Sequence, residues 1–190
     1  MKKIILGLCL LLFTVSLNAE GKLLFDLNAQ HFSNSILKKD KYTKGGRYDL
    51  PNAVVETDMY NKSHSYYKGT FTTTLKTMPK SWHVAITIFN YYDNQTLIRV
   101  GSNSGTSSIL SIDDKTNTIS INNKKFEVGS SDLYDKTLEI DIASINNAIT
   151  FQINGQEFYK MKADEFKMLR DVQVSPGYNC YLSRLKVFSK

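Results

Sequence analysis

A strict alternation of apolar and polar side chains constrains the fold of this chain more than any other feature. From residue 66 onward the pattern has a period of two; every even-numbered residue from Trp82 to Ile88, for example, is apolar. A period of two predicts strands with one buried face. Further strands are expected at residues 23–27, 54–56, 66–75, 95–101, 107–113, 116–122, 125–128, 137–142, 148–154, 156–159, 171–175 and 181–188.

The segments between these runs contain turn residues suited to hairpins. Asn154-Gly155 is the strongest signal, because both residues tolerate the positive φ of a type I′ turn. The residues 163–170 are expected to form a short helix, with Phe166 and Leu169 on its apolar side. Many short strands and almost no helix predict an all-β fold, an antiparallel β-sandwich with one short helix near the C-terminus.

The first 19 residues have the pattern of a secretory signal peptide. A basic start is followed by an apolar run from Ile4 to Val15 and a small residue, Ala19, at the expected cleavage site. Cleavage there would leave one domain, residues 20–190, with no second long apolar run to span a membrane. We therefore expect a bacterial exported protein, located in the periplasm, outside the cell or at its surface.

Charge and cysteine content exclude some classes of function. Removing residues 1–19 takes away Lys2 and Lys3 and lowers the formal net charge from +6 to +4, a scattered excess that does not favour a nucleic-acid partner. Cys9 leaves with the signal, so Cys180 cannot form an internal disulfide in the mature chain. Its apolar and aromatic neighbours favour a buried side chain over a reactive thiol.

The order of the predicted strands, with the segment "FQINGQEF" at residues 151–158, resembles the concanavalin A-like lectin and glucanase jelly rolls. That group includes laminin G-type domains, carbohydrate-binding modules and laminarinase-type hydrolases. The resemblance implies two curved sheets and a ligand on the outer, concave face of one of them. It does not imply one activity, because this fold carries lectins, lyases, hydrolases and adhesion domains.

Alternation predicts which side chains could reach such a ligand. If their strands belong to the concave sheet, its open face carries carboxylates, an arginine, an amide and an aromatic ring, which suit hydroxyls and the apolar face of a sugar. The candidate ligand-binding residues are Tyr91, Arg99, Glu139, Asp141 and Gln152. The first hypothesis is a non-catalytic exported domain that binds a carbohydrate or another extracytoplasmic ligand. An envelope structural or protein-interaction module is an alternative.

A small glycoside hydrolase or polysaccharide lyase is the other alternative. Glu139-Ile140-Asp141-Ile142 matches the start of the laminarinase-type signature Glu-x-Asp-x-(x)-Glu, whose two glutamates are the nucleophile and the acid/base. Ala143 and Ser144 occupy the two positions available to the second glutamate, and neither can protonate a leaving group. Glu127 or Glu157 would have to substitute from another strand. We therefore predict no catalytic residue.

No cofactor is expected from the sequence. His31, His64 and His83 lack metal-binding spacing. The loop Asp113-Asp114-Lys115-Thr116-Asn117 offers oxygen ligands that could hold calcium, although a polar hairpin loop explains the same residues.

Overall fold

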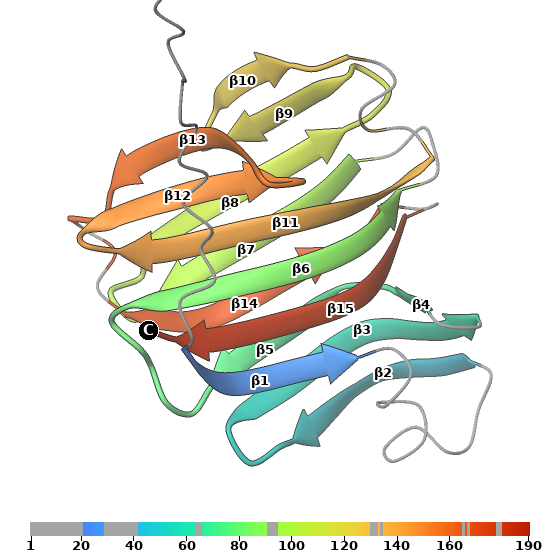
Figure 1. Cartoon of the computed structure of the whole chain (residues 1–190). Helices are drawn as coiled ribbons and strands as arrows, with labels where there is room; N and C mark the ends of the chain where they lie inside the picture. The colour runs from blue at the N-terminus through green and yellow to red at the C-terminus, as the bar shows by residue number, and fades with distance from the viewer. Residues whose placement is uncertain are drawn as a thin grey trace, which may run out of the picture.

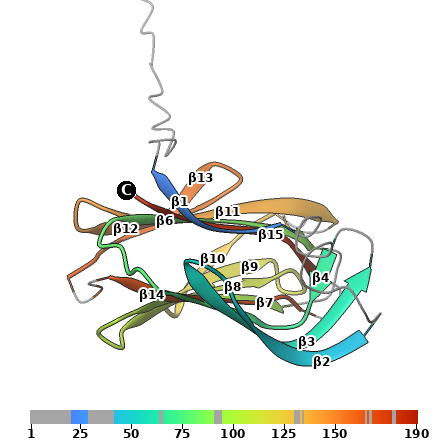
Figure 2. The same ribbon diagram turned by 90° about the horizontal axis from the view of Figure 1, so that it is seen from below.

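A computed structural model describes residues 21–28, 42–63, 66–90, 95–129, 133, 135–164, 166, 168–177 and 180–190. All of its strand pairings are antiparallel, and the strands form two layers packed face to face (Figures 1 and 2). The predicted signal peptide lies outside the described residues.

The front sheet, nearest the viewer in Figure 1, has the order β13-β12-β11-β6-β15, with β1 paired to the free side of β15. The first and last described strands are therefore neighbours. The bounds are β1 (Lys22–Asn28), β6 (Trp82–Asn90), β11 (Lys136–Ile145), β12 (Ala148–Ile153), β13 (Gln156–Lys162) and β15 (Cys180–Ser189).

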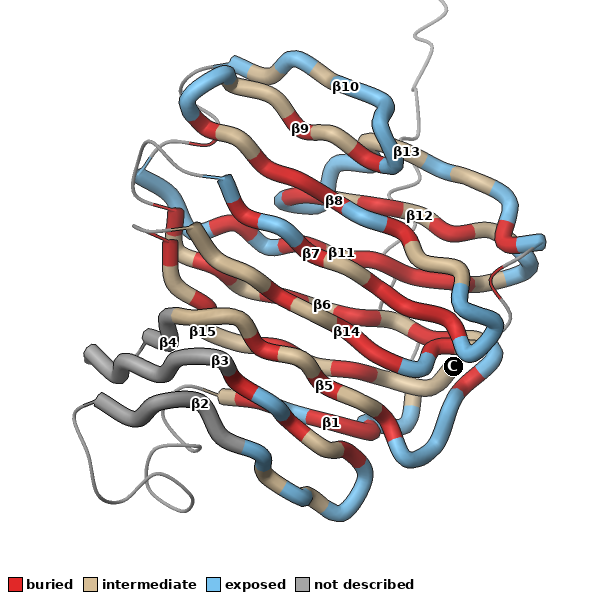
Figure 3. The backbone as a smooth tube through the Cα atoms, turned by 180° about the vertical axis from the view of Figure 1, so that it is seen from behind, coloured by how far each residue is buried: buried red, intermediate tan, exposed pale blue. Residues whose placement is uncertain are grey.

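The back sheet has the order β10-β9-β8-β7-β14-β5-β3-β2. It consists of β2 (Tyr42–Asp49), β3 (Ala53–Ser63), β5 (Phe71–Leu75), β7 (Gln95–Ser102), β8 (Ser107–Asp113), β9 (Thr118–Ile121), β10 (Lys124–Glu127) and β14 (Leu169–Ser175). Buried residues alternate with more exposed ones in β5 and β9 and over part of β7 and β8 (Figure 3).

Residues 66–75, predicted as one strand, form two. Gly69 has φ 110°, a conformation that side chains disfavour, and the chain turns there. The strand β4 (Tyr66–Lys68) before the turn pairs with β15 of the front sheet, whereas β5 after it pairs with β14 of the back sheet. The long strand β3 pairs with both and so connects the two sheets at this edge.

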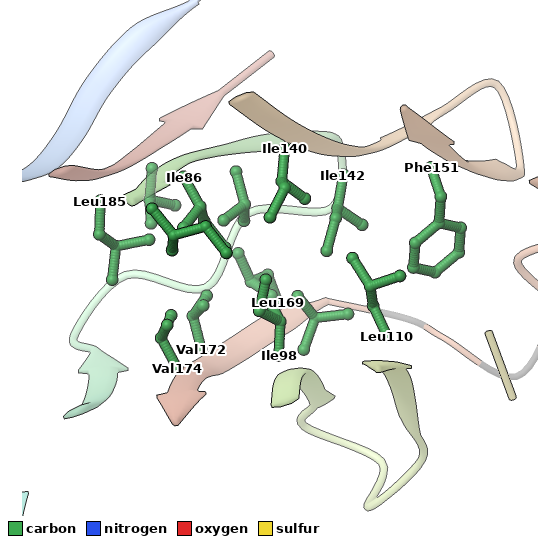
Figure 4. Packing of buried hydrophobic residues seen from close by; sticks show 14 of the residues in the cluster. Ile86, Ile98, Leu110, Ile140, Ile142, Phe151, Leu169, Val172, Val174 and Leu185 are labelled. Atoms are coloured by element: carbon green, nitrogen blue, oxygen red, sulfur yellow. The ribbon is translucent and has the colours of Figure 1, made fainter. Parts of the chain in front are cut away.

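The core lies between the layers and consists of the inward-facing residues of both sheets. Ile86, Ile140 and Leu185 from the front sheet meet Ile98 and Val172 from the back sheet, all of them 0–1% exposed (Figure 4). Each buried side chain of this size contributes roughly 1.5–3 kcal/mol to folding. Burial of this extent is how a domain without a disulfide obtains its stability.

The expected helix at residues 163–170 is wrong. Among the described residues of this span, the Phe166 amide donates to the Ala163 carbonyl (2.9 Å), as in a turn, and β14 already begins at Leu169. The last two residues of the expected helix belong to β14, which pairs with β7 from Leu169 onward, so tertiary context overrides the local preference.

The hairpin turn predicted at Asn154-Gly155 is confirmed. Both residues have positive φ (50° and 77°), as a type I′ turn requires. The same conformation occurs at Asn146-Asn147 (50° and 59°), between β11 and β12.

Candidate functional site

The outer face of the front sheet presents a hollow of about 250 Å³ that we call the charged trough. It runs along the central strand β6, where the small side chains of Ala85 and Thr87 form its floor. Its walls come from the strands on either side and are lined by Glu139, Asp141, Arg184 and Lys186. Small residues between long charged ones create the depression.

Strand register places the two walls opposite each other. Ala85 pairs with Asp141 on one side and Lys186 on the other, and Thr87 pairs in the same way with Glu139 and Arg184. The walls are two strand spacings apart, or roughly 9.6 Å between Cα atoms. The carboxylates of β11 thus face the cations of β15 across a gap that a ligand can enter.

Two of the four wall charges already have partners within the protein. Asp141 Oδ1 lies 2.6 Å from His83 Nε2, and Arg184 donates to both carboxylate oxygens of Asp26 on β1 (2.8 and 3.1 Å). The hydrogen bond to Asp26 raises the pKa of the Arg184 guanidinium, against a smaller opposing effect of burial. These bonds fix the orientation of one group in each wall.

The other two wall charges, Glu139 and Lys186, make no side-chain hydrogen bond or ion pair within the described part of the chain. They lie on opposite walls and are available to a ligand. Lys190 lies near Asp141, and burial lowers the pKa of its ammonium while the Asp141 charge acts in the opposite direction.

Aromatic rings lie at both ends of the trough. Phe188 stacks on His83 at one end, with ring centroids 5.5 Å apart. Phe89 and Tyr181 are paired across β6 and β15 at the other end. Six residues of strand separate the two ends, which corresponds to about 20 Å.

The predicted ligand-binding residues do not all lie together. Glu139, Asp141 and Gln152 share the outer face of the front sheet, and Gln152 is directly opposite Asp141. Tyr91 lies outside the described residues. The sequence analysis did not identify Arg184 and Lys186 as site residues, because the pairing of β15 with β6 is a tertiary contact. The segment "SRLKV" does place both on the polar side of the last strand.

The prediction that Arg99 shares a face with the acids is wrong. Arg99 lies on β7, in the back sheet, and its side chain is on the opposite side of the sandwich. Its Nη1 donates to Asp171 Oδ1 at 2.7 Å, and that carboxylate is only 5% exposed. Arg99 therefore forms an ion pair within the back sheet and does not line the charged trough.

The geometry of β11 argues against a laminarinase-type catalytic strand. A glutamate at position 143 or 144 would have to share the outer face with Glu139 and Asp141, and position 144 reaches that face only through a β-bulge. The register of β11 is unbroken through Ser144, so Ser144 faces the core and is 4% exposed. Ala143 faces outward but is buried.

Glu127 and Glu157, the alternative candidates for the second catalytic acid, also lie away from Glu139. Glu127 belongs to β10 of the back sheet, away from this face. Glu157 shares the face but is opposite Gln152, two strands beyond Asp141. Neither acid faces Glu139 across the trough.

The loop considered for calcium is organised as a turn. The carboxylate of Asp113 accepts hydrogen bonds from the amides of Lys115 (3.1 Å) and Thr116 (3.2 Å). Within the described residues there is no cluster of three or more His, Cys, Asp or Glu side chains that could hold a metal ion.

Cys180 is buried, as its neighbours predicted. Its Sγ lies 2.6 Å from Asn90 Oδ1, and the amide nitrogen of Asn90 donates to the Leu133 carbonyl and to Asp114. The described part of the chain contains no helix that is long and apolar enough to cross a bilayer.

Comparisons with known proteins identify the fold. The chain matches no protein-family profile and no curated sequence. Among solved structures, it is similar to the agglutinin CG-16 from chicken liver, with 12% identity and a TM-score of 0.50 over 62% of this chain and 98% of that one. It is also similar to the laminarinase catalytic domain of Thermotoga maritima, with 9% identity and a TM-score of 0.52 over 90% and 99% of the two chains.

A third similar structure is the Crh5 transglycosylase, with 11% identity and a TM-score of 0.55 over 89% of this chain and 86% of that one. The protein therefore has the concanavalin A-like lectin and glucanase jelly-roll fold. At these identities the comparisons define the fold alone, and it is shared by lectins and by glycoside hydrolases.

Proposed function

We propose that this protein is an exported, non-catalytic carbohydrate-binding domain whose ligand lies in the charged trough. The signal-like residues 1–19 support export to the periplasm or the cell surface. The fold supports carbohydrate as the ligand class, since galectins and glucanases share it.

The unpaired charges of the trough are the observation that carries the proposal. Glu139 accepts hydrogen bonds from hydroxyl or amino groups, and Lys186 donates to ring, hydroxyl or carboxylate oxygens. The paired groups Asp141 and Arg184 add acceptors and donors of fixed orientation, and Gln152 extends the polar wall. The rings at the two ends offer apolar surface for sugar rings.

The residues of β11 support a non-catalytic role. Retaining and inverting glycosidases both require two carboxyl groups placed on either side of the scissile bond. Here the wall opposite Glu139 and Asp141 is cationic, and positions 143 and 144 lack an acid. The trough is therefore suited to holding a glycan without cleaving it.

A glycan array with the purified protein tests the ligand class, followed by calorimetry on any ligand found. We expect Glu139→Gln and Lys186→Gln each to weaken binding about tenfold, as expected for loss of one charged hydrogen bond. Glu127→Gln and Lys125→Gln, on the exposed edge strand β10, are matched controls that should bind normally.

Two results would contradict the proposal. No binding across neutral, acidic and amino polysaccharides would remove the carbohydrate ligand and favour an envelope interaction module. Release of reducing ends from a β-glucan, abolished by Glu139→Gln, would show that the protein is a hydrolase.

A further inference from the structure

A second site, separate from the trough, lies at one end of the sandwich, where the β11–β12 hairpin, the start of β6 and the β13–β14 connection meet. This end cavity has a volume of about 460 Å³ and opens where β6 begins, next to the β11–β12 hairpin at the left of Figure 1. Its lining includes the apolar side chains of Ala163, Phe166 and Met168, and the polar residues Lys80 and Ser144. Its volume is within the range of small-molecule sites, roughly 300–1,000 Å³.

One buried polar group without a partner, the Trp82 indole, adjoins this cavity, and the Ser144 hydroxyl lines it. Ser144 faces the core, lines the cavity and is 4% exposed, yet its hydroxyl makes no hydrogen bond within the described residues. Trp82 is directly opposite Ser144 in the sheet and fully buried, and its indole nitrogen also lacks an acceptor. Buried polar groups are nearly always hydrogen-bonded, so the indole nitrogen is an exception, and the neighbouring Ser144 hydroxyl is available to a ligand in the cavity.

Three residues that line the cavity are neighbours of Trp82. Its ring packs against Phe166 at a centroid distance of 5.3 Å, and its chain neighbour Ser81 and its strand partner Ser144 line the cavity with Phe166. A molecule in the cavity would therefore contact the immediate surroundings of the indole.

The walls of the cavity are held in place by hydrogen bonds. The amide of Ala163 donates to the Asn147 carbonyl (2.9 Å), and the amide of Leu169 donates to the Pro79 carbonyl (3.0 Å). The Asn147 side chain donates a hydrogen bond to Asp164 Oδ1 at 2.7 Å, so this carboxylate at the rim already has a partner. A preformed site of this kind needs little reorganisation to bind a ligand.

Two of the lining side chains, Lys80 and Ser144, are hydrogen-bond donors without a partner in the described part of the chain. Lys80 at the rim is exposed and makes no ion pair within the described part of the chain, and Ser144 offers a hydroxyl group. An acceptor-bearing ligand with an apolar body matches these donors and the Phe166 and Met168 side chains.

We propose that the end cavity binds a small carboxylic acid with a compact apolar body. The carboxylate would accept hydrogen bonds from the Ser144 hydroxyl and the Lys80 ammonium, and the apolar body would lie against Phe166 and Met168. This site is independent of the carbohydrate ligand proposed for the trough, because the cavity and the trough share no lining residue.

Trp82 is the only tryptophan in the sequence, so its indole N–H resonance reports on the cavity without ambiguity. Titrating the ¹⁵N-labelled protein with cyclohexanecarboxylate should shift this resonance saturably, with a Kd of about 1 mM. Cyclohexanemethanol, which has the same body without the charge, should bind about tenfold more weakly.

Two variants test the assigned residues. Lys80→Gln, a surface change that leaves the core intact, should weaken binding of the acid about tenfold, whereas the remote exposed Lys115→Gln should not. Ser144→Leu should fill the mouth of the cavity and abolish the shift. An indole resonance that does not move, equal binding of acid and alcohol, or unchanged affinity in Lys80→Gln would each overturn the proposal.

Discussion

Replacing Arg99 by methionine tests whether this residue is structural. Arg99 Nη1 and Asp171 Oδ1 are 2.7 Å apart, and the Asp171 side chain is only 5% exposed. The carboxylate lies over Gly101, where even a Cβ atom would approach Asp171 Oδ1 to 2.4 Å, so Asp171 has little room to turn toward water. Arg99→Met keeps most of the side-chain length but leaves the buried Asp171 carboxylate with Arg170 as its remaining ion-pair partner.

The expected cost follows from the burial of the pair. Removing one partner of a buried ion pair costs about 3–5 kcal/mol. Arg99 itself is 37% exposed, and Arg170 Nε remains 3.2 Å from Asp171 Oδ2, so we reduce this to about 2 kcal/mol. For a domain of this size that loss lowers the Tm by roughly 4–8 °C.

The matched control is Arg47→Met. Arg47 also pairs with an acid across two strands of the back sheet, at 3.2 Å from Glu56, but both side chains are more than half exposed. Such a pair contributes about 0–1 kcal/mol. Urea unfolding and calorimetry of both variants would compare them, and glycan binding should be normal in each. Equal stability losses would refute the structural reading of Arg99, and loss of glycan binding in Arg99→Met would show that it contacts the ligand.

Three further predictions concern the fold. Phe151→Ala should lower the free energy of unfolding by about 3–5 kcal/mol, measured in urea, because Phe151 is 1% exposed in the core. Gly69→Ala should cost about 1–2 kcal/mol in the same assay, since residue 69 has φ 110°; unchanged stability would mean that the chain can turn there otherwise. Cys180 should react with a thiol reagent only upon unfolding, because it is fully buried; rapid labelling of the folded protein would contradict this.

Local patterns in the sequence were sufficient for the strands and most turns. The alternation around Ile86 and Ile140 correctly separated inward from outward side chains, because a strand has a strict period of two. The Asn154-Gly155 turn was predictable because few residue pairs tolerate positive φ at both positions. The helix expected near Phe166 does not form, since Leu169 and Arg170 belong to β14 and Phe166 makes a turn contact with Ala163.

Which strands are neighbours required the tertiary structure. Arg99 and Glu139 both face outward from their strands, yet they lie on opposite faces of the sandwich, and alternation has the same form in either sheet. In the same way, Lys186 joins Asp141 only because β15 and β11 flank β6. The sequence by itself determined an all-β sandwich and the side of each strand that is polar. Only packing of distant strands decided which polar residues share a site, because that contact is made between segments far apart in the chain.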